Sequence, residues 1–104
     1  MTPILPAPDC TTMADVRAGV DALDRELVAM LVRRFGYMDA AARIKPARES
    51  VRDEARKAQV IANARDMAQA AGLPHEVVSE LWERLVEASI AYELEAFDRR
   101  ASPR

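Results

Sequence analysis

Apolar residues recur every three or four positions over most of the chain, and this spacing predicts three helices and no strand. The first predicted helix spans residues 12–45, the second 50–71 and the third about 75–98. We therefore expect an all-α fold with one very long N-terminal helix. Residues 1–11 contain three prolines and no period, so they are predicted to be an extended, mobile lead-in, and residues 99–104 a frayed tail.

Capping signals mark the predicted helix ends. Thr12 and Asp15 form a Thr-x-x-Asp capping box, and Pro46 disfavours helical geometry at the residue before it. Ser50 and Asp53 form a second capping box at the start of the second predicted helix. Gly72 suits a left-handed cap at its end, and Pro74 suits the first turn of the third helix.

Positive charge lies on the apolar side of the long helix. Arg34 occupies a position where the spacing calls for a leucine, and Lys45 follows eleven residues later, which is three turns or about 16 Å. Two cations on one face can clamp an extended dianion. Arg17 lies about 42 Å from Lys45 along the helix axis, so it cannot join them within one chain.

The length of this helix predicts a second copy of the chain. It would run to about 50 Å, whereas a domain of about 100 residues has a radius of gyration near 13 Å. Pairing two copies antiparallel about the helix centre buries the apolar side symmetrically. It also brings Arg17 of one copy opposite residues 39–40 of the other, midway between Arg34 and Lys45. We therefore predict a homodimer with two sites, each built from both chains.

Two polar residues interrupt the apolar side of the third helix. Ser89 and Glu93 are four residues apart and so share a face. A carboxyl group in such a stripe needs a partner. Either Glu93 turns outward near the helix end, or it faces the cavity that holds the cations.

Composition narrows the class of protein. At 104 residues the chain is predicted to form one domain, residues 1–104, with 50% hydrophobic and 5% aromatic residues. Its net charge is -2, and basic residues are not interleaved with stacking aromatics, so we expect no nucleic-acid partner. No apolar run approaches the 20 or so residues of a membrane span, and the start does not resemble a secretory signal, which favours a cytoplasmic location. One cysteine and one histidine do not suggest a metal site.

The chain resembles the all-helical chorismate mutases over nearly its whole length. Its opening, Asp9-Cys10-Thr11 followed by residues 13–17, is especially similar to the branch that contains isochorismate pyruvate-lyase. The motifs that carry the resemblance are Val16-Arg17 with Asp21 and Asp24, Arg33-Arg34 with Lys45, Val51-Arg52-Asp53-Glu54 with Arg56, and Ser89 with Glu93.

The resemblance implies an intertwined helical dimer that holds chorismate as a dicarboxylate and rearranges it to prephenate without a metal or organic cofactor. Matched positions would place Arg17 of the partner and Arg34 at the substrate carboxylates, and Lys45 at a carboxylate and the ether oxygen. The remaining matches are Asp53 and Arg56 near the ring, Ser89 near a carboxylate, and Glu93 as second donor to the ether oxygen. A pericyclic reaction needs only such positioning and charge stabilisation.

Two departures from the family pattern leave alternatives open. Glu93 stands where bacterial mutases often carry glutamine, and a carboxyl group can donate only when it is protonated. Lys57 stands where some mutases have a glutamate for the ring hydroxyl, which favours an isochorismate pyruvate-lyase that yields salicylate and pyruvate. A third alternative is a non-catalytic helical dimerisation or regulatory module, because fold does not fix function. In that case Arg34 would be an interfacial ion-pair residue, and Arg48, Arg52 and Arg56 solvated surface groups.

Overall fold

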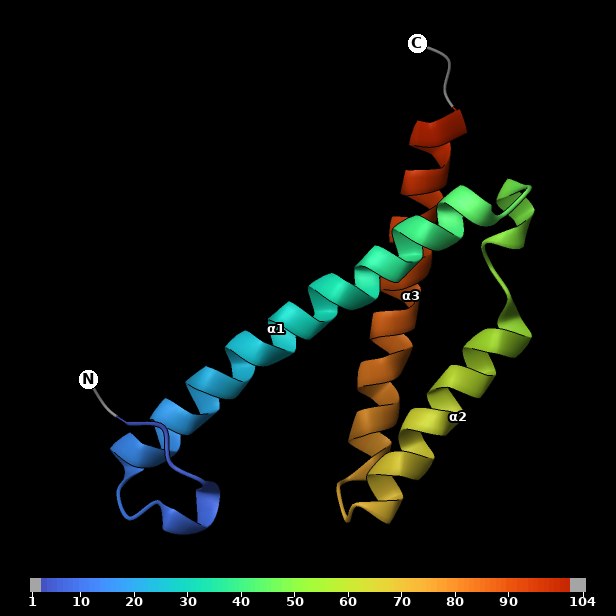
Figure 1. The fold of residues 1–104 in the computed structure, drawn as a ribbon. Coiled ribbons are helices and arrows are strands. Elements are labelled where there is room, and N and C mark those ends of the chain that lie inside the picture. Colours follow the sequence, from blue (N-terminus) through green and yellow to red (C-terminus); the bar gives the residue numbers. More distant parts are fainter. Residues whose placement is uncertain (1–2, 102–104) are drawn as a thin grey trace. The chain divides into compact units, whose positions relative to one another are not determined.

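The chain is an all-α protein, as the apolar spacing predicts. The structure, a computed structural model, describes residues 3–101. These residues form three α-helices, α1 (Met13–Ile44), α2 (Glu54–Ala70) and α3 (His75–Ala101), and two 3₁₀ turns, Ala7–Asp9 and Arg48–Ser50, with no strand among them (Figure 1). None of the described helices has the length and apolar character needed to cross a bilayer.

Two compact units make up the chain, Met1–Arg34 and Phe35–Arg104. The boundary falls inside α1, so the first two thirds of that helix belong to the first unit and its last ten residues to the second. The assignment of residues 1–104 to one domain stays a prediction.

The capping box predicted at the start of α1 is confirmed. The Asp15 amide donates to Thr12 Oγ1 over 3.1 Å, and Asp15 Oδ2 accepts from the Thr12 amide over 3.2 Å. The same carboxylate oxygen accepts from the Thr11 amide over 3.1 Å. These amide hydrogen bonds, the one from Thr11 foremost, hold the pKa of Asp15 below its ordinary value. The Asp15 amide in the first turn of α1 and the two amides before the helix therefore have side-chain acceptors.

The lead-in contains a 3₁₀ turn, Ala7–Asp9, which corrects the prediction that it is extended throughout, while its mobility stays a prediction. The Asp9 and Cys10 amides donate to Pro6 O and Ala7 O over 2.9 and 3.2 Å and close the first 3₁₀ turn. Prolines with fixed backbone angles favour such a turn without any apolar period. The lead-in and the start of α1 enclose an apolar cavity of about 450 Å³, lined by residues that include Leu5, Cys10 and Val16. Residues 1 and 2 lie outside the described part of the chain.

The apolar side of α1 in the first unit is exposed in the single chain. Leu23, Leu27 and Met30 each keep more than half of their surface exposed. The exposed large apolar residues of this part of the helix are Met13, Val16, Val20, Leu23, Leu27, Val28, Met30, Leu31 and Val32. A continuous apolar surface of this kind is typical of an interface with another protein surface.

The second unit is built around an antiparallel pair of helices, α2 and α3, which pack side by side (Figure 1). Its core is centred on Val51, Val86 and Ile90. Partly buried apolar residues surround that centre: Val60, Ile61, Trp82, Leu94 and Phe97. On α2 the buried positions are Ala64 and Ala68, small side chains that allow the helices to approach closely.

Both ends of α2 have capping hydrogen bonds. Asp53, not Ser50, is its N-cap, with Oδ1 accepting from the Arg56 amide over 3.0 Å. The expected start at Ser50 is therefore wrong, because residues 48–50 form a 3₁₀ turn instead. Gly72 has a positive φ of 76°, and the Leu73 amide donates to Ala68 O over 2.9 Å. This is the left-handed glycine cap that the sequence predicts.

The C-terminal part of α3 is longer than expected. Helix continues to Ala101, so residues 99–101 are helical and the predicted frayed tail is wrong there. Two arginines in the last turn, Arg99 and Arg100, oppose the negative end of the helix dipole. Residues 102–104 lie outside the described part of the chain.

An aromatic contact joins the end of α1 to α3 within the second unit. The rings of Phe35 and Tyr92 meet edge to face, with centroids 5.0 Å apart and an interplanar angle of 66°. Tyr92 Oη donates to Asp39 Oδ2 over 2.9 Å, and this bond raises the pKa of Tyr92. Residues 35–44 are thereby fixed against α3, immediately before Lys45.

Candidate active site

A lysine and a buried glutamate meet between the end of α1 and the middle of α3. Lys45 Nζ lies 2.6 Å from Glu93 Oε2, and the Glu93 side chain is only 6% exposed. Of the two alternatives for Glu93, the outward orientation is wrong, because the carboxylate is buried and is compensated by the Lys45 ammonium group. Breaking such a pair by removing one partner leaves an uncompensated charge in a buried place.

Lys45 is positioned by the end of α1 and by the turn that follows. Its amide donates to Ala41 O over 2.9 Å, which completes the last helical turn, and Pro46 then ends the helix. Its ammonium group also donates to Val51 O over 3.2 Å. Two of its three N–H donors are thus used within residues 3–101, and the third can be offered to a ligand. The Lys45 side chain is 29% exposed, so that ligand can come from solvent.

Ser89 lies one turn before Glu93 on α3 and is buried as well. Its hydroxyl donates to Leu85 O over 2.7 Å. A serine can make this bond to the helix backbone and still accept from, or rotate toward, another polar group. The structure therefore places Ser89 on the same face of α3 as Glu93, as the four-residue spacing predicts.

Asp53 and Arg56 occupy the first turn of α2. The Asp53 carboxylate caps the helix, as described above, and Arg56 Nη1 donates to Gln59 Oε1 over 2.8 Å. Both residues are exposed. Their predicted roles near a substrate ring stay predictions.

Arg17 and Arg34 lie on the part of α1 that belongs to the first unit. They are 17 residues apart, about 26 Å along the helix axis, so the two guanidinium groups cannot grip one small molecule within a single chain. The convergence of Arg17 of a partner with Arg34 and Lys45 stays a prediction.

Ionic contacts between the loop after Lys45 and α3 were not anticipated from the sequence, which suggested solvated arginines. Arg48 Nε lies 2.9 Å from Asp98 Oδ1, and Arg52 Nη2 lies 2.9 Å from Glu87 Oε1. Each arginine uses a second nitrogen on the same carboxylate, over 3.3 and 3.0 Å. The partners are 50 and 35 residues apart in sequence, beyond the reach of helical spacing rules.

Lys57 joins the same network from α2. Its ammonium group lies 2.9 Å from Glu83 Oε1 and 2.8 Å from Glu87 Oε2, and its side chain is only 16% exposed. Hydrogen bonds from Arg52 first and from Lys57 second lower the pKa of Glu87 to about 2. The contact with Glu87 is likewise the main cause that raises the pKa of Lys57. The ammonium group of Lys57, a residue of α2, is therefore held against α3 in its charged form.

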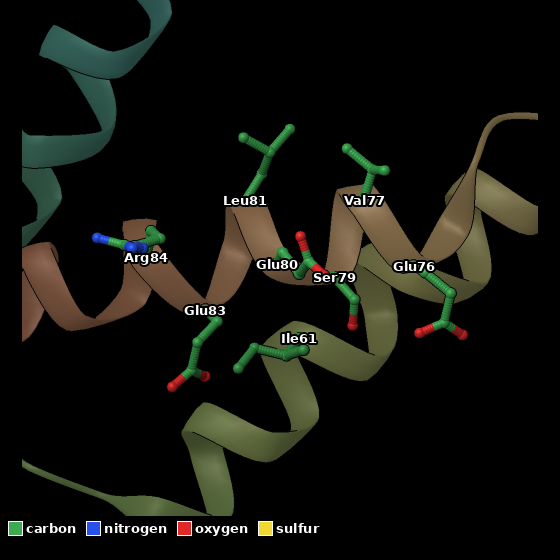
Figure 2. A pocket seen from close by; sticks show the side chains of 8 residues that line it. All are labelled: Ile61, Glu76, Val77, Ser79, Glu80, Leu81, Glu83 and Arg84. Atoms are coloured by element: carbon green, nitrogen blue, oxygen red, sulfur yellow. The ribbon is translucent and has the colours of Figure 1, made fainter.

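A cavity of about 600 Å³ beside α2 and α3 contains none of the predicted site residues. It is lined by Ile61 of α2 and by α3 residues that include Glu76, Glu80 and Glu83 (Figure 2). Figure 2 shows Val77 and Leu81 projecting from α3 on the side away from Ile61. Three carboxylates and one guanidinium, that of Arg84, give this cavity an acidic lining. Two of these carboxylates are paired with cations outside the lining, Glu76 with Arg65 and Glu83 with Lys57, so only part of this negative charge is uncompensated.

Comparisons of the sequence with known proteins show which family the chain matches. The family model described as chorismate mutase type II matches residues 16–94, a stretch that includes Arg17, Lys45 and Glu93. The chain belongs to the chorismate mutase type II family. It is also 30% identical over 86 residues to a protein of Pseudomonas aeruginosa named isochorismate pyruvate lyase, across 83% of this chain and 85% of the relative. The resemblance expected from the sequence motifs is thus confirmed.

Residues 3–101 of this chorismate mutase type II family member contain no cluster of three or more histidine, cysteine, aspartate or glutamate side chains arranged to hold a metal ion. The polar groups in contact with Lys45 are instead a carboxylate and a backbone carbonyl, both of which accept from its ammonium group. The ammonium group is the donor here that can bind an anionic organic molecule.

The Arg52–Glu87–Lys57 network predicts a specific loss of stability in acid. Because the pKa of Glu87 is lowered from its ordinary value of 4.5 to about 2, its contribution is present above pH 4.5 and disappears as the pH falls through about 2. Glu87→Gln should therefore flatten the fall of the urea midpoint between these pH values. Glu95→Gln, which loses only a looser 3.6 Å contact with Arg99, is the matched control and should keep the wild-type slope. Equal slopes for Glu87→Gln and wild type would contradict the prediction.

Proposed function

We propose that the chain is a chorismate mutase that rearranges chorismate to prephenate. The observation that carries the proposal is the Lys45–Glu93 pair, in which an ammonium and a buried carboxyl group lie 2.6 Å apart. Both groups can address one oxygen atom of a ligand placed beside them. The match to the chorismate mutase type II family supports an enzyme that acts on a chorismate-related substrate.

The proposed mechanism requires no nucleophile. In a pericyclic rearrangement the protein contributes by holding the enolpyruvyl arm over the ring and by stabilising the charge that develops as the C–O bond breaks. Lys45 supplies a compact positive charge at the ether oxygen. Arg34 and the partner's Arg17 bind the two carboxylates through their guanidinium forks. Ser89, Asp53 and Arg56 complete the proposed substrate contacts.

Glu93 must change its role when substrate binds. In the free chain its carboxylate accepts from Lys45. Substrate carboxylates add negative charge around it, which favours uptake of a proton, and a neutral carboxyl group can donate to the ether oxygen. Lys45 is then released from Glu93 and turns to the substrate. The proposed site therefore exchanges an internal ion pair for contacts with the ligand.

A homodimer is part of the proposal. The exposed apolar side of α1, from Met13 to Val32, supports burial against a second copy. An isologous antiparallel pairing uses the same surface on both chains. It also supplies the second arginine, Arg17, that one chain cannot bring to its own site.

Isochorismate pyruvate lyase activity is the second candidate. It is favoured by the relative of that name. It is also favoured by Lys57, which stands where some mutases have a glutamate that accepts from the ring hydroxyl, and which Glu83 and Glu87 hold as a cation. Without a carboxylate there, chorismate and isochorismate would be distinguished less sharply. The same cations would then assist loss of pyruvate by a pericyclic hydrogen transfer.

A paired assay separates the two activities. Purified protein is given chorismate or isochorismate, while loss of chorismate, formation of prephenate and appearance of fluorescent salicylate are followed. We expect prephenate from chorismate to be the faster reaction. Faster formation of salicylate and pyruvate from isochorismate would identify a lyase and direct attention to Lys57. No product from either substrate would favour the non-catalytic helical module.

Glu93→Gln tests the donor role of the carboxyl group. Because only the protonated acid donates, turnover of the wild type should fall as the pH rises, whereas glutamine donates at every pH and should flatten the profile. Glu95→Gln changes a carboxylate two residues away whose side chain is 74% exposed, and should leave the profile unchanged. A flat profile for the wild-type protein would rule out this role.

Mixed dimers test the contribution of Arg17 in trans. Arg17→Ala and Lys45→Ala should each lower kcat about 100-fold or more, the scale of removing one group that stabilises developing charge. When the two inactive proteins are unfolded and refolded together, half of the dimers are mixed and each has one intact site. About a quarter of the wild-type activity should then return. Refolding each variant alone is the control, and no recovery in the mixture would exclude sites shared between copies.

A further inference from the structure

The segment that follows Lys45 is attached to α3 at three places. Residues 46–53 connect α1 to α2 and contain the 3₁₀ turn Arg48–Ser50, which contacts α3. Near one end of the segment Arg48 binds Asp98, and near the other Arg52 binds Glu87. Between them Val51 is 4% exposed in the core with Val86 and Ile90.

Along the axis of α3, Glu93 lies between the two carboxylates that bind the segment, Glu87 and Asp98. Glu87 and Asp98 are eleven residues apart, which is three turns or about 16 Å, and they therefore lie on nearly the same face of the helix. Glu93 lies between them, six residues after Glu87 and five before Asp98. Six and five residues are not whole numbers of turns, so Glu93 faces a different side of α3 from Glu87 and Asp98; it is 6% exposed, whereas they are 41% and 50% exposed. The link between the segment and Lys45 is therefore made by the segment's own backbone.

The backbone of the same segment touches the lysine directly. Val51 O accepts from Lys45 Nζ over 3.2 Å, and the Val51 amide donates to Arg48 O over 3.1 Å. Burial of the Val51 side chain fixes the centre of the segment but leaves rotation about that point possible. A two-point contact between a guanidinium and a carboxylate at each end restricts that rotation, because its geometry is directional.

We propose that the two arginine–carboxylate pairs flanking Val51 are positioning groups for Lys45. They hold the carbonyl of Val51 in the place where it and Glu93 together direct the ammonium group. The proposal rests on the proposed function for its catalytic consequence, since Lys45 is the group placed at the reacting oxygen. Exposed ion pairs contribute little to global stability, and Glu87 keeps its contact with Lys57 when Arg52 is removed, so the expected effect is mainly on the position of Lys45 and only slightly on folding.

Two lysines are present in the whole sequence, Lys45 and Lys57, and this makes the position of Lys45 measurable. Trace labelling of amines with acetic anhydride, read by mass spectrometry, reports how freely each ammonium group leaves its partners. Lys57 is the internal reference, because Glu83 and Glu87 hold it without Arg48, and loss of Arg52 leaves Glu87 to Lys57 alone.

The test compares wild type with Arg48→Gln/Arg52→Gln. We expect Lys45 to be labelled about fivefold faster or more in the variant, with Lys57 labelled no faster and the denaturation midpoint little changed. In the paired assay kcat should fall about tenfold, more than KM rises, because misplacing a catalytic group acts mainly on the transition state. The charge-exchanged variant Arg48→Asp/Asp98→Arg, which restores a pair in reverse, should label Lys45 more slowly than Arg48→Asp alone.

Arg65→Gln is the matched control. It removes an arginine–glutamate contact of similar exposure between α2 and α3, the 2.8 Å pair of Arg65 with Glu76, and should leave Lys45 labelling and kcat unchanged. Unchanged Lys45 labelling in Arg48→Gln/Arg52→Gln would overturn the proposal. Faster labelling of both lysines would also overturn it, and so would faster labelling of Lys45 with an unaltered kcat. If the wild type acts on neither substrate, the proposed function fails, while the labelling result still decides whether the pairs position Lys45.

Discussion

The contact between Lys45 and the buried carboxylate of Glu93 is the interaction on which the second unit depends. A carboxylate on a side chain only 6% exposed is tolerated on the inner face of α3 because an ammonium group lies 2.6 Å away. The pair joins the end of α1, which Pro46 terminates, to α3. The charge that makes the interior possible is also the charge that the proposed reaction uses. Structure and proposed chemistry therefore make competing demands on one side chain.

The residues around this contact explain how the competition can be managed. Lys45 has a second acceptor in the carbonyl of Val51, so its ammonium group has one contact that does not depend on Glu93. Ser89 and Glu93 share a face of α3, and the Arg52–Glu87–Lys57 network fixes the adjoining surface. The positively charged side chains of Lys45, Arg52 and Lys57 are thus held by different sets of acceptors. A dicarboxylate would meet a preorganised set of cations, which lowers the cost of ordering them on binding.

Sequence spacing was sufficient for some features and not for others, and the difference has a physical basis. Helices, the Thr12 box and the Gly72 cap depend on interactions within a few residues, so local pattern predicted them. For Glu93 the sequence left two alternatives, turning outward or facing the cations, because a carboxyl group on an apolar stripe requires a partner. The Arg48–Asp98 and Arg52–Glu87 pairs could not be predicted, since they depend on the path of the 46–53 segment. The lead-in fold was missed because its hydrogen bonds follow proline geometry and not apolar period.

The glycine cap at Gly72 also bears on the order of folding. It joins α2 and α3 with a short connection, so their contacts close small loops at little entropic cost, and we expect this hairpin to form early. The contacts of Arg48 with Asp98 and of Lys45 with Glu93 span 50 and 48 residues and must close much larger loops. We expect these contacts to form last. A chain could then reach its full helix content, as circular dichroism would report it, before Lys45 has met Glu93.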